Sequence, residues 1–555
     1  MTGARIRDAG DSALVADLGD VVDVAVNRRA IGLAARVRAA AVAGVRDVVP
    51  AFRSVAVFFD PLRTDVEALR ALLQPQPQDD AERSRREAVE IPVEYGGESG
   101  PDLDALAGAT GLAPADVVAC HSAREYRVFM VGFLPGFAYL GELDPAIAAP
   151  RHASPRLRVP AGSVGIAGRQ TGVYPQASPG GWQIVGRTTT RPFDSGRTPA
   201  SLLAPGDRVR FVPVPSGSLG SFDTAWASPP APPAPPAPPA PHAASAVPRA
   251  VRVLQAGLMT SVQDGGRWGR QHEGVPVSGA MDAAALRDAN RAVGNPAGAA
   301  ALEATLGGFE ARLEHSGAVA VAGADLDATI DGRPLPLGAR VEHGIGAVVR
   351  FGSRRAGTRA YLALDGGLDV PICLGSRATD LTSGLGGWHG RRLRAGDQVP
   401  VKTPTPETSL VTRVPARPLP HGGARVRVLP GPHSDSFPPE AIEVLRRTRF
   451  EVTSESNRMG YRLKGSQPVP GGTGDMISDA TCTGGLQVPP SGHPILLMAD
   501  RQVTGGYPIV ATVISADLPV VGQLAPGDWI EFDLCTLAEA LAALARLESA
   551  DGRGA

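Results

Sequence analysis

The first 75 residues alternate between strand-like and helix-like hydrophobic patterns. Two short apolar runs lie on either side of a turn at Gly10, and apolar residues then recur at helical spacing from about 22 to 43. Strand-like runs between 45 and 60 precede a second helical pattern around Leu69. This order of strand, strand, helix, strand, strand, helix predicts a small α+β unit at residues 1–80, with helices packed on one sheet.

From Val89 the pattern changes to short strands separated by many turns. Two short helices are expected, with Asp102 and Asp116 near their N-terminal ends, where carboxylates commonly cap helices. A glycine-rich run and an alternating strand after Pro205 close this unit, which we place at 88–216. The chain contains 67 glycines and 52 prolines, and such a turn-rich composition favours a mainly β fold.

The glycine-rich run, residues 158–187, has a related run at 488–519. A Pro-Gly-Asp followed by an alternating strand comes after each run, at Pro205 and at Pro526. We interpret the two regions as one kind of domain used twice. The paired elements are Val159-Pro160 with Val488-Pro489, Arg169-Gln170 with Arg501-Gln502, Thr171-Gly172 with Thr504-Gly505, and Tyr174-Pro175 with Tyr507-Pro508.

A proline- and alanine-rich tract at 226–249 is the clearest boundary in the chain. Such a tract favours polyproline II and acts as a spacer, although it could instead be a ligand for a proline-binding domain. Beyond it, alternating strands and one helix predict a β domain at 250–402. After a Pro/Thr-rich segment we place a second barrel-like β domain at 421–535 and a terminal helix at Leu537–Leu547.

Composition excludes several classes of function. A formal net charge of −1 and a pI of about 6.8 argue against binding to nucleic acid or to an anionic membrane surface. The four cysteines show no paired spacing, which indicates a reducing compartment. Neither a secretory signal pattern nor an apolar stretch long enough to span a membrane is evident, so we predict a cytoplasmic protein.

Standard catalytic signatures are missing, including the phosphate-binding GxxxxGK[ST] loop, HExxH and GxSxG. The polar residues of the two related runs are the first candidates, because arginine, glutamine, threonine and tyrosine can hold a small polar molecule by hydrogen bonds. We expect substrate- or nucleotide-binding residues among Arg169, Gln170, Thr171, Tyr174, Arg501, Gln502, Thr504 and Tyr507.

A second group of candidates could carry proton transfer. Asp500 follows an apolar strand directly and precedes a glycine turn, a place where binding groups are often mounted. Asp264 and Asp282 lie in glycine-rich loops with Ser278, and Asp282 either caps the following helix or acts in the site. His121, at the end of a short helix, is either a structural or a catalytic histidine.

The motifs resemble a known family over nearly the whole chain outside the proline tract. GFLPGFAYL, RVPAGSVGIAGRQTGVYP and LLAPGDRVRFVPV are similar to subunit 1 of allophanate-hydrolase-like proteins, also called the B subunit of 5-oxoprolinase. TSVQDGGRWG, GVPVSGAMD, LGSRATD, SNRMGYRL and QVPPSGHPILLMADRQVTGGYP are similar to subunit 2, or the C subunit of 5-oxoprolinase. The resemblance implies tandem cyclophilin-like β-barrels beside a small α+β domain, in a fusion of two subunits.

The resemblance also implies three possible functions. The first is a fused B/C component of ATP-dependent 5-oxoprolinase, an amidohydrolase that opens the lactam of 5-oxoproline to glutamate with a separate A subunit. The second is a biotin-dependent carboxyltransferase component that acts on urea or a similar amide with a separate carrier. The third is a binding protein that inhibits a histidine kinase. We favour the first.

Under this hypothesis the cofactor is ATP, inferred to be bound with magnesium, whereas biotin is expected only for the carboxyltransferase. Arg169 and Arg501 would clamp a carboxylate or phosphate, because guanidinium groups bind such anions bidentately. Asp264, Asp282, Asp500 and His121 are the catalytic candidates, and the metal ligands are unknown.

Overall fold

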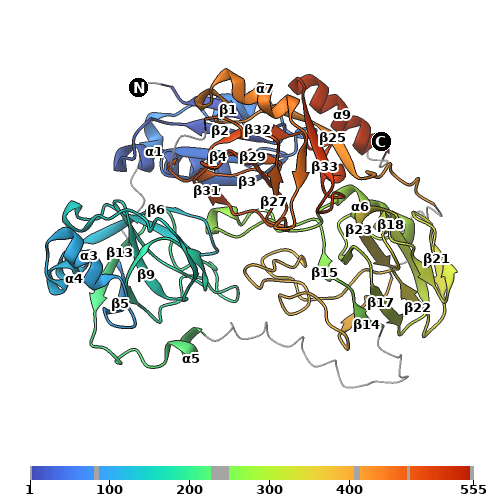
Figure 1. The fold of residues 1–555 in the computed structure, drawn as a ribbon, viewed down its shortest axis with the longest axis horizontal. Coiled ribbons are helices and arrows are strands. Elements are labelled where there is room, and N and C mark those ends of the chain that lie inside the picture. Colours follow the sequence, from blue (N-terminus) through green and yellow to red (C-terminus); the bar gives the residue numbers. More distant parts are fainter. Residues whose placement is uncertain (1–2, 81–86, 227–248, 405–412, 472–475, 551–555) are drawn as a thin grey trace.

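The computed structural model describes residues 3–80, 87–226, 249–404, 413–471 and 476–550. Most of the predicted proline-rich spacer lies outside these ranges. Figure 1 shows four bodies: an N-terminal sheet beside the second barrel, the first barrel, and a two-sheet body. The prediction of a mainly β fold with two closed barrels and an α+β unit is confirmed.

The N-terminal unit is an antiparallel sheet of order β1-β2-β4-β3 with α1 packed on it. Helix α1 begins after Asp23, whose carboxylate accepts hydrogen bonds from the backbone N–H groups of Ala25 and Val26, and it ends before the predicted boundary. The elements are β1 Arg5–Asp8, β2 Ala13–Asp17, α1 Val24–Ala39, β3 Val45–Pro50, β4 Ser54–Phe59, α2 Val66–Leu72 and the 3₁₀ turn η1 Pro77–Asp80.

The first barrel closes in the order β10-β7-β6-β13-β5-β12-β9. Its elements are β5 Val89–Tyr95, α3 Leu103–Thr110, α4 Pro114–Ser122, β6 Glu125–Val131, β7 Ala138–Gly141, η2 Pro145–Ile147, β8 Arg156–Val159, β9 Ser163–Ala167, β10 Gln170–Val173, β11 Ser178–Gly180, β12 Gln183–Arg187, β13 Arg208–Pro213 and α5 Phe222–Trp226. Asp116 accepts a hydrogen bond from the N–H of Ala113 at the start of α4. Asp102 makes no such cap bond and instead forms an ion pair with Arg156 of β8.

The middle of the second half is a pair of sheets that enclose one large apolar core. One sheet has the order β20-β19-β22-β17-β14-β24, and the other has the order β15-β16-β23-β18-β21. The elements are β14 Ala250–Ala256, β15 Met259–Gln263, η3 Gln271–Glu273, α6 Ala283–Val293, β16 Ala301–Thr305, β17 Phe309–Leu313, β18 Gly317–Asp325, β19 Thr329–Ile330, β20 Arg333–Pro334, β21 Val341–His343, β22 Val348–Arg350, β23 Ala356–Leu364 and β24 Gln398–Pro400.

The second barrel closes in the order β25-β32-β29-β30-β27-β26-β33. Its elements are β25 Gly423–Pro430, η4 Ser434–Ser436, α7 Pro439–Arg447, β26 Phe450–Val452, β27 Gly460–Lys464, β28 Asp479–Ala480, β29 Gly485–Gln487, β30 Ile495–Leu497, β31 Thr504–Gly505, β32 Ile509–Val513, α8 Leu518–Val521 and β33 Trp529–Leu534, followed by α9 Leu537–Ala550.

The two barrels share one topology. In each, the first strand pairs in parallel with the last, as β5 with β13 and β25 with β33, and the remaining strands follow in the same cyclic order. Each also carries a two-stranded arm, β8–β11 or β28–β31. The predicted reuse of one domain is therefore visible in the strand order.

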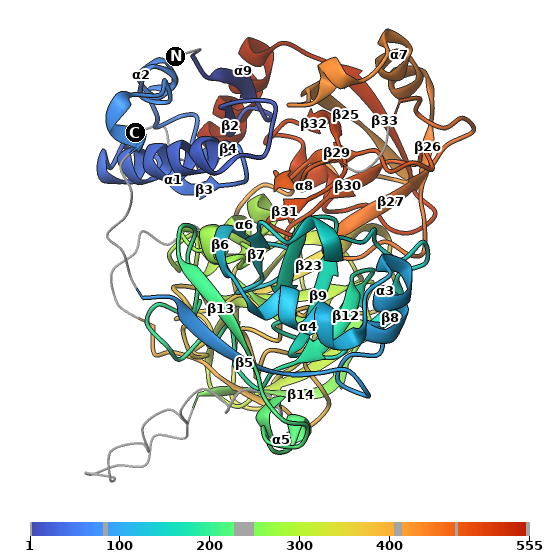
Figure 2. The ribbon, with the colours of Figure 1, turned by 90° about the vertical axis from the view of Figure 1, so that its left-hand side faces the viewer.

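The N-terminal unit packs on the second barrel, although more than 400 residues separate them in sequence (Figures 1 and 2). Asp11 accepts hydrogen bonds from the N–H and hydroxyl of Ser515, and the hydroxyl of Ser54 donates to Asp479 at 2.6 Å. Apolar side chains of β2 and β4 share a core with those around β28 and β32. The two halves are thus joined by a buried interface.

Among the described residues, no single helix is long and apolar enough to cross a membrane, whereas α3 and α4, which meet at 95°, pass that test only as a bent pair.

Candidate functional site

A cavity of about 800 Å³ lies where the N-terminal sheet, the start of α6, the second barrel and α9 meet. Its wall includes Phe58 of β4, Trp268 and Ser278 between β15 and α6, and Arg501 after β30. The guanidinium of Arg46 lies 5.2 Å from the ring centroid of Trp268. Both halves of the chain therefore contribute to one cavity with cationic and aromatic walls.

Arg501 is the most unusual group in this cavity, because its side chain is 2% exposed and has only neutral partners among the described residues. Nη2 donates to Oε1 of Gln271 at 2.6 Å, and Nε and Nη1 donate to the hydroxyls of Thr483 and Thr481. Burial lowers the pKa of Arg501 to about 10. Asp47 attracts Arg501 electrostatically but forms no ion pair with it among the described residues, and a buried cation that no acid contacts is costly, so the position favours binding of an anion.

Ser278 and Asp264 line the same cavity but differ in their hydrogen bonds. Ser278 has a positive φ of 55°, and its buried hydroxyl has no hydrogen-bond partner within the described parts of the chain. The carboxylate of Asp264 accepts hydrogen bonds from the N–H of Gly266, the hydroxyl of Ser376 and the N–H of Arg377. Ser278 is thus available to a ligand, whereas Asp264 holds two loops together.

Asp282 caps helix α6, which is the structural alternative for this residue. One carboxylate oxygen accepts a hydrogen bond from the N–H of Ala285 at 2.8 Å, and the other accepts one from Nε2 of Gln523 at 2.7 Å. Burial raises the pKa of Asp282 to about 6. Both oxygens are used in structural contacts.

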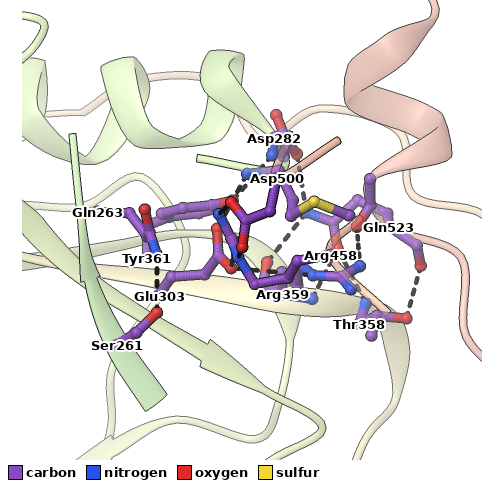
Figure 3. A network of polar contacts seen from close by, with 12 residues as sticks. Ser261, Gln263, Asp282, Glu303, Thr358, Arg359, Tyr361, Arg458, Asp500 and Gln523 are labelled. Atoms are coloured by element: carbon purple, nitrogen blue, oxygen red, sulfur yellow. Dashed lines mark hydrogen bonds and ion pairs between the residues drawn. The ribbon is translucent and has the colours of Figure 1, made fainter. Parts of the chain in front are cut away.

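Asp500 belongs to a buried network of charges rather than to the cavity wall (Figure 3). Arg458 donates to both oxygens of Asp500, at 2.9 and 3.0 Å, and also forms an ion pair with Glu303. The hydroxyl of Tyr361 donates to Glu303 at 2.7 Å. Arg458 further donates to the backbone carbonyl of Gly279, so the network holds the loop that carries Ser278 against the second barrel.

His121 lies inside the first barrel, stacked 4.6 Å from Phe211, and is fully buried. The hydroxyl of Thr171 donates its proton to the carbonyl of Gly165, so its oxygen must accept the hydrogen bond from Nε2 of His121. The proton of the neutral imidazole is therefore on Nε2, and Nδ1 accepts a hydrogen bond from the hydroxyl of Tyr95. Burial lowers the pKa of His121 to about 3. These contacts place His121 and Thr171 in the barrel core.

Replacing His121 by glutamine is expected to reduce the loss of stability in acid. The neutral form is favoured in the folded state, so its contribution is complete above the ordinary pKa of 6.5 and is lost as the pH falls toward 3. The slope contributed is about 1.4 kcal/mol of unfolding free energy per pH unit. Urea unfolding between pH 7 and 4 measures this pH dependence, with a glutamine replacement of the exposed His421 as the control. Equal slopes of unfolding free energy against pH in the wild type and both variants would contradict the buried, neutral state of His121.

Tyr174 is buried against Phe137 and Trp182, and burial raises its pKa to about 12. Arg169, by contrast, lies in the turn between β9 and β10 with its side chain 60% exposed, at 4.0 Å from Glu142. Gln170 begins β10 and is partly exposed. Within the described residues, none of these three lines the cavity or contacts Arg501.

The residue pairing between the two related runs is wrong, although the domain repeat exists. By strand order, β9 and β10 correspond to β29 and β30. Val159-Pro160 precedes β9 but Val488-Pro489 follows β29, and Arg169 lies between β9 and β10 whereas Arg501 follows β30. The position equivalent to Arg501 is therefore near Tyr174, and the similar motifs occupy different turns.

The remaining candidates lie around β31. The hydroxyl of Thr504, which is buried, accepts a hydrogen bond from the N–H of Phe133 at 2.8 Å, so Thr504 joins the second barrel to the first. The backbone carbonyl of Gln502 accepts from Thr481, and Tyr507 is 36% exposed. The predicted binding set is thus divided between the cavity, the interior of the first barrel, a barrel interface and the surface.

Comparisons with known proteins agree with the two-part organisation. Residues 4–203 match the profile described as carboxyltransferase domain, subdomain C and D, and residues 273–534 match that of carboxyltransferase domain, subdomain A and B. The chain is 40% identical over 296 residues to the C subunit of 5-oxoprolinase from Escherichia coli K12, which covers 53% of this chain and 94% of that protein. The chain belongs to the carboxyltransferase domain family.

Other relatives show how the family's parts are combined here. The chain is 43% identical over 218 residues to the B subunit of 5-oxoprolinase from Escherichia coli O157:H7, which covers 39% of this chain and 99% of that protein. The crystal structure of TTHA0988 aligns with a TM-score of 0.80 at 38% identity and covers 95% of this chain and 100% of that one. The resemblance to the B and C subunits of 5-oxoprolinase is therefore confirmed, in one polypeptide.

The similarity extends to a second kind of enzyme. Urea amidolyase of Saccharomyces cerevisiae is 35% identical over 304 residues, which is 51% of this chain and 16% of that protein. The family's relatives are thus enzymes or enzyme subunits that differ in the reaction named.

The sequence pattern did not identify several charged and polar residues that lie around the cavity. Arg458 and Glu303 are 155 positions apart, and Gln271 and Arg501 are 230 apart. Arg458 lies in the motif SNRMGYRL, which carried the resemblance but offered no charge pattern of its own. Only their burial and mutual contacts reveal their place beneath the cavity.

Proposed function

We propose that this chain is the fused B and C component of 5-oxoprolinase and opens the lactam of 5-oxoproline to L-glutamate together with a separate A subunit. The observation that supports this proposal most strongly is Arg501, a buried cation without an acidic partner among the described residues, in a cavity lined by both halves. The substrate carries a carboxylate, which a guanidinium binds bidentately. The free hydroxyl of Ser278 offers a further contact in the same cavity.

The residues of this chain do not fit a magnesium–nucleotide complex. The cavity wall contains arginines but no lysine, and no group of three or more metal-ligating side chains occurs in the described part of the chain. We therefore assign ATP to the A subunit. What this chain's residues do is bind the substrate anion at Arg501, which lies over the ring of Phe58 in the cavity wall.

The test combines the purified chain with the A subunit and measures phosphate and glutamate together. Phosphate release from ATP is expected only when 5-oxoproline is present, in proportion to the glutamate formed. The A subunit alone and this chain alone are the controls. Phosphate release that does not depend on 5-oxoproline would contradict the proposal.

The similarity to urea amidolyase supports one alternative, a carboxyltransferase that acts on urea or another amide with a biotin carrier. Exchange of labelled CO₂ between carboxybiotin and urea, without ATP or the A subunit, would identify this reaction. Absence of exchange together with 5-oxoproline-dependent turnover would exclude it.

Replacing Arg169 by alanine is expected to leave turnover within about twofold and stability within about 0.5 kcal/mol, because exposed substitutions outside special contacts have small effects. The side chain is 60% exposed, and its only ion pair within the described residues spans 4.0 Å. The phosphate-release assay and thermal unfolding measure both quantities. A tenfold loss of turnover would place Arg169 in a site that the barrel turn does not suggest.

A further inference from the structure

Gln271 of η3 is a fully buried glutamine that binds the guanidinium of Arg501. Its Oε1 accepts a hydrogen bond from Nη2 of Arg501 at 2.6 Å, and Gln271 itself does not line the cavity. A guanidinium carries only donors, so the amide oxygen of Gln271 must face it. Gln271 therefore acts on the cavity through Arg501.

The other contacts of Arg501 fix the plane of its guanidinium. Nη1 and Nε donate to the hydroxyls of Thr481 and Thr483 at 3.0 and 3.1 Å. The central carbon of the guanidinium lies 5.4 Å from the ring centroid of Phe58, in the N-terminal unit. Each of these groups is uncharged. Together with Gln271 they determine the direction of the guanidinium in the cavity wall without cancelling its charge.

The first half of the chain holds η3 in position. The carboxylate oxygen Oδ2 of Asp47, in β3, accepts hydrogen bonds from the N–H groups of Gly269 and Gln271, both at 3.0 Å. The N–H of Gly136, in the first barrel, donates to the carbonyl of Glu273 at 2.9 Å. The position of Gln271 therefore depends on the N-terminal unit and on the first barrel.

The contact between η3 and the first barrel is closest at Gly274, directly after η3. A Cβ atom at this position would lie 2.4 Å from the carbonyl oxygen of Leu134, and the backbone φ is +77°. Only glycine fits both the close approach and this conformation. The backbone of the first barrel therefore lies directly against the end of η3 and limits its movement.

The uncharged amide at position 271 preserves the charge of the cavity wall. A glutamate there would have nearly the same shape and would form an ion pair with Arg501, because carboxylates bind guanidinium groups strongly. Asp47 attracts Arg501 electrostatically but forms no ion pair with it among the described residues. The guanidinium is therefore held by a neutral acceptor, and its charge remains available to an anion in the cavity.

We propose that Gln271 is a positioning residue that determines specificity for an anionic ligand, because it directs Arg501 at the cavity and leaves its charge uncompensated. The ligand class is a small cyclic amide whose carboxylate binds Arg501, in preference to the same amide without a charge. Both halves of the chain take part, because the first half holds η3 and the second half carries Arg501. This inference rests on the proposed function, whose substrate carries such a carboxylate.

The test measures binding of 5-oxoproline and of 5-oxoprolinamide, its neutral carboxamide, to the full-length protein by calorimetry at pH 7.5. The wild type is expected to bind 5-oxoproline about tenfold or more tightly than the carboxamide, because a hydrogen bond between charged groups contributes at least this factor. In Gln271→Glu the new carboxylate neutralises Arg501, so this preference should disappear. The affinity for 5-oxoprolinamide should stay close to that of the wild type.

Gln271→Met separates the direction of Arg501 from its charge. Methionine removes the acceptor and adds no carboxylate, so Arg501 keeps its charge and loses its fixed direction. The preference for 5-oxoproline should decrease in this variant without disappearing. In the Arg501→Met background the same replacement should have no further effect on the preference, because residues that act through one another are not additive. A residue with a merely structural role would weaken both ligands by the same factor in both backgrounds.

Gln487→Glu is the matched control, because Gln487 is also a buried glutamine but donates to the carbonyl of Tyr507 in the second barrel. It should retain the preference for 5-oxoproline. Thermal unfolding checks that each variant folds, and if Gln271→Glu does not, Gln271→Met in the two backgrounds decides. Equal binding of the two ligands by the wild type, or an unchanged preference in the folded variants of Gln271, would overturn the inference.

Failure of this inference and failure of the proposed function give different results. If Gln271→Glu loses the preference but phosphate release with the A subunit does not depend on 5-oxoproline, the positioning role stands and the proposed function fails. If phosphate release depends on 5-oxoproline while Gln271→Glu keeps both the preference and wild-type turnover, the proposed function stands and the positioning role fails.

Discussion

Arg501→Met is expected to lower the kcat/KM for 5-oxoproline-dependent phosphate release by about 10²- to 10³-fold, while the protein stays folded. Removing one partner of a buried charge pair costs about 2–5 kcal/mol of binding free energy, and every 1.4 kcal/mol is tenfold. In the protein without substrate, the guanidinium donates hydrogen bonds only to Gln271, Thr481, Thr483 and a backbone carbonyl among the described residues, and it lies over the ring of Phe58. The substrate carboxylate would be its missing counter-charge.

Stability separates a binding role from a structural one at this position. Methionine fills much of the same space without a buried charge, and replacing buried charges by apolar groups is often neutral or stabilising. Thermal unfolding of Arg501→Met should therefore stay near that of the wild type. Addition of 5-oxoproline should raise the unfolding temperature of the wild type alone, because a ligand stabilises only the protein that binds it.

Arg501→Lys is the matched control for charge. Lysine keeps the positive charge but lacks the planar fork, so we expect activity between those of the wild type and Arg501→Met. Activity of Arg501→Met within threefold of wild type, in a protein that unfolds normally, would remove Arg501 from the site. The steady-state assay with the A subunit decides between these results.

The sequence predicted the elements well where a local pattern controls them. Hydrophobic periodicity predicted α1 and the strands around it, and the repeated Pro-Gly-Asp turns before β13 and β33 indicated one domain used twice. It could not predict that β2 and β4 pack on the second barrel, because that contact joins Ser54 to Asp479 across 425 positions. Such contacts depend on which apolar faces remain uncovered after each domain has formed.

The candidate site was predicted only in part, for a related reason. The sequence placed Asp500 and Arg501 together at a strand end, but their side chains have different surroundings: Arg501 lines the cavity and Asp500 pairs with Arg458. The motif comparison paired Arg169 with Arg501, since similar residues recur in both runs. Strand order shows that they occupy different turns, which explains why one is exposed and the other buried.

Arg458→Met is expected to destabilise the protein by about 3–5 kcal/mol at pH 7, the largest effect on stability that we predict. The guanidinium is buried between Glu303 and Asp500, and its removal leaves Asp500 without its ion-pair partner and Glu303 with only Arg359, at 3.9 Å, as a nearby cation. Urea unfolding measures the loss. Limited proteolysis near Gly279, whose carbonyl accepts from Arg458, should show whether the loop of Ser278 opens.

The pH dependence distinguishes this electrostatic cause from a packing defect. In the wild type, burial acts to raise the pKa of Glu303, but the attraction of Arg458 and Arg359 outweighs burial and lowers the pKa. The ionised Glu303 therefore stabilises the folded protein above pH 4.5, and this stabilisation is lost as the pH falls. Without Arg458, burial raises the pKa, and the variant is least stable once Glu303 ionises. The difference between the two proteins should therefore shrink as the pH falls from 7 toward 4.

Neutralising the carboxylates provides the control. The triple variant Arg458→Met, Glu303→Gln, Asp500→Asn should recover most of the lost stability, because an apolar side chain between neutral groups replaces the buried ion pairs. Its recovery should be independent of pH in the same range. If the triple variant is as unstable as Arg458→Met at every pH, the loss comes from packing around Tyr361 and Gly279 and not from charge. The network beneath the cavity would then stabilise the loop of Ser278 by packing and not by its ion pairs.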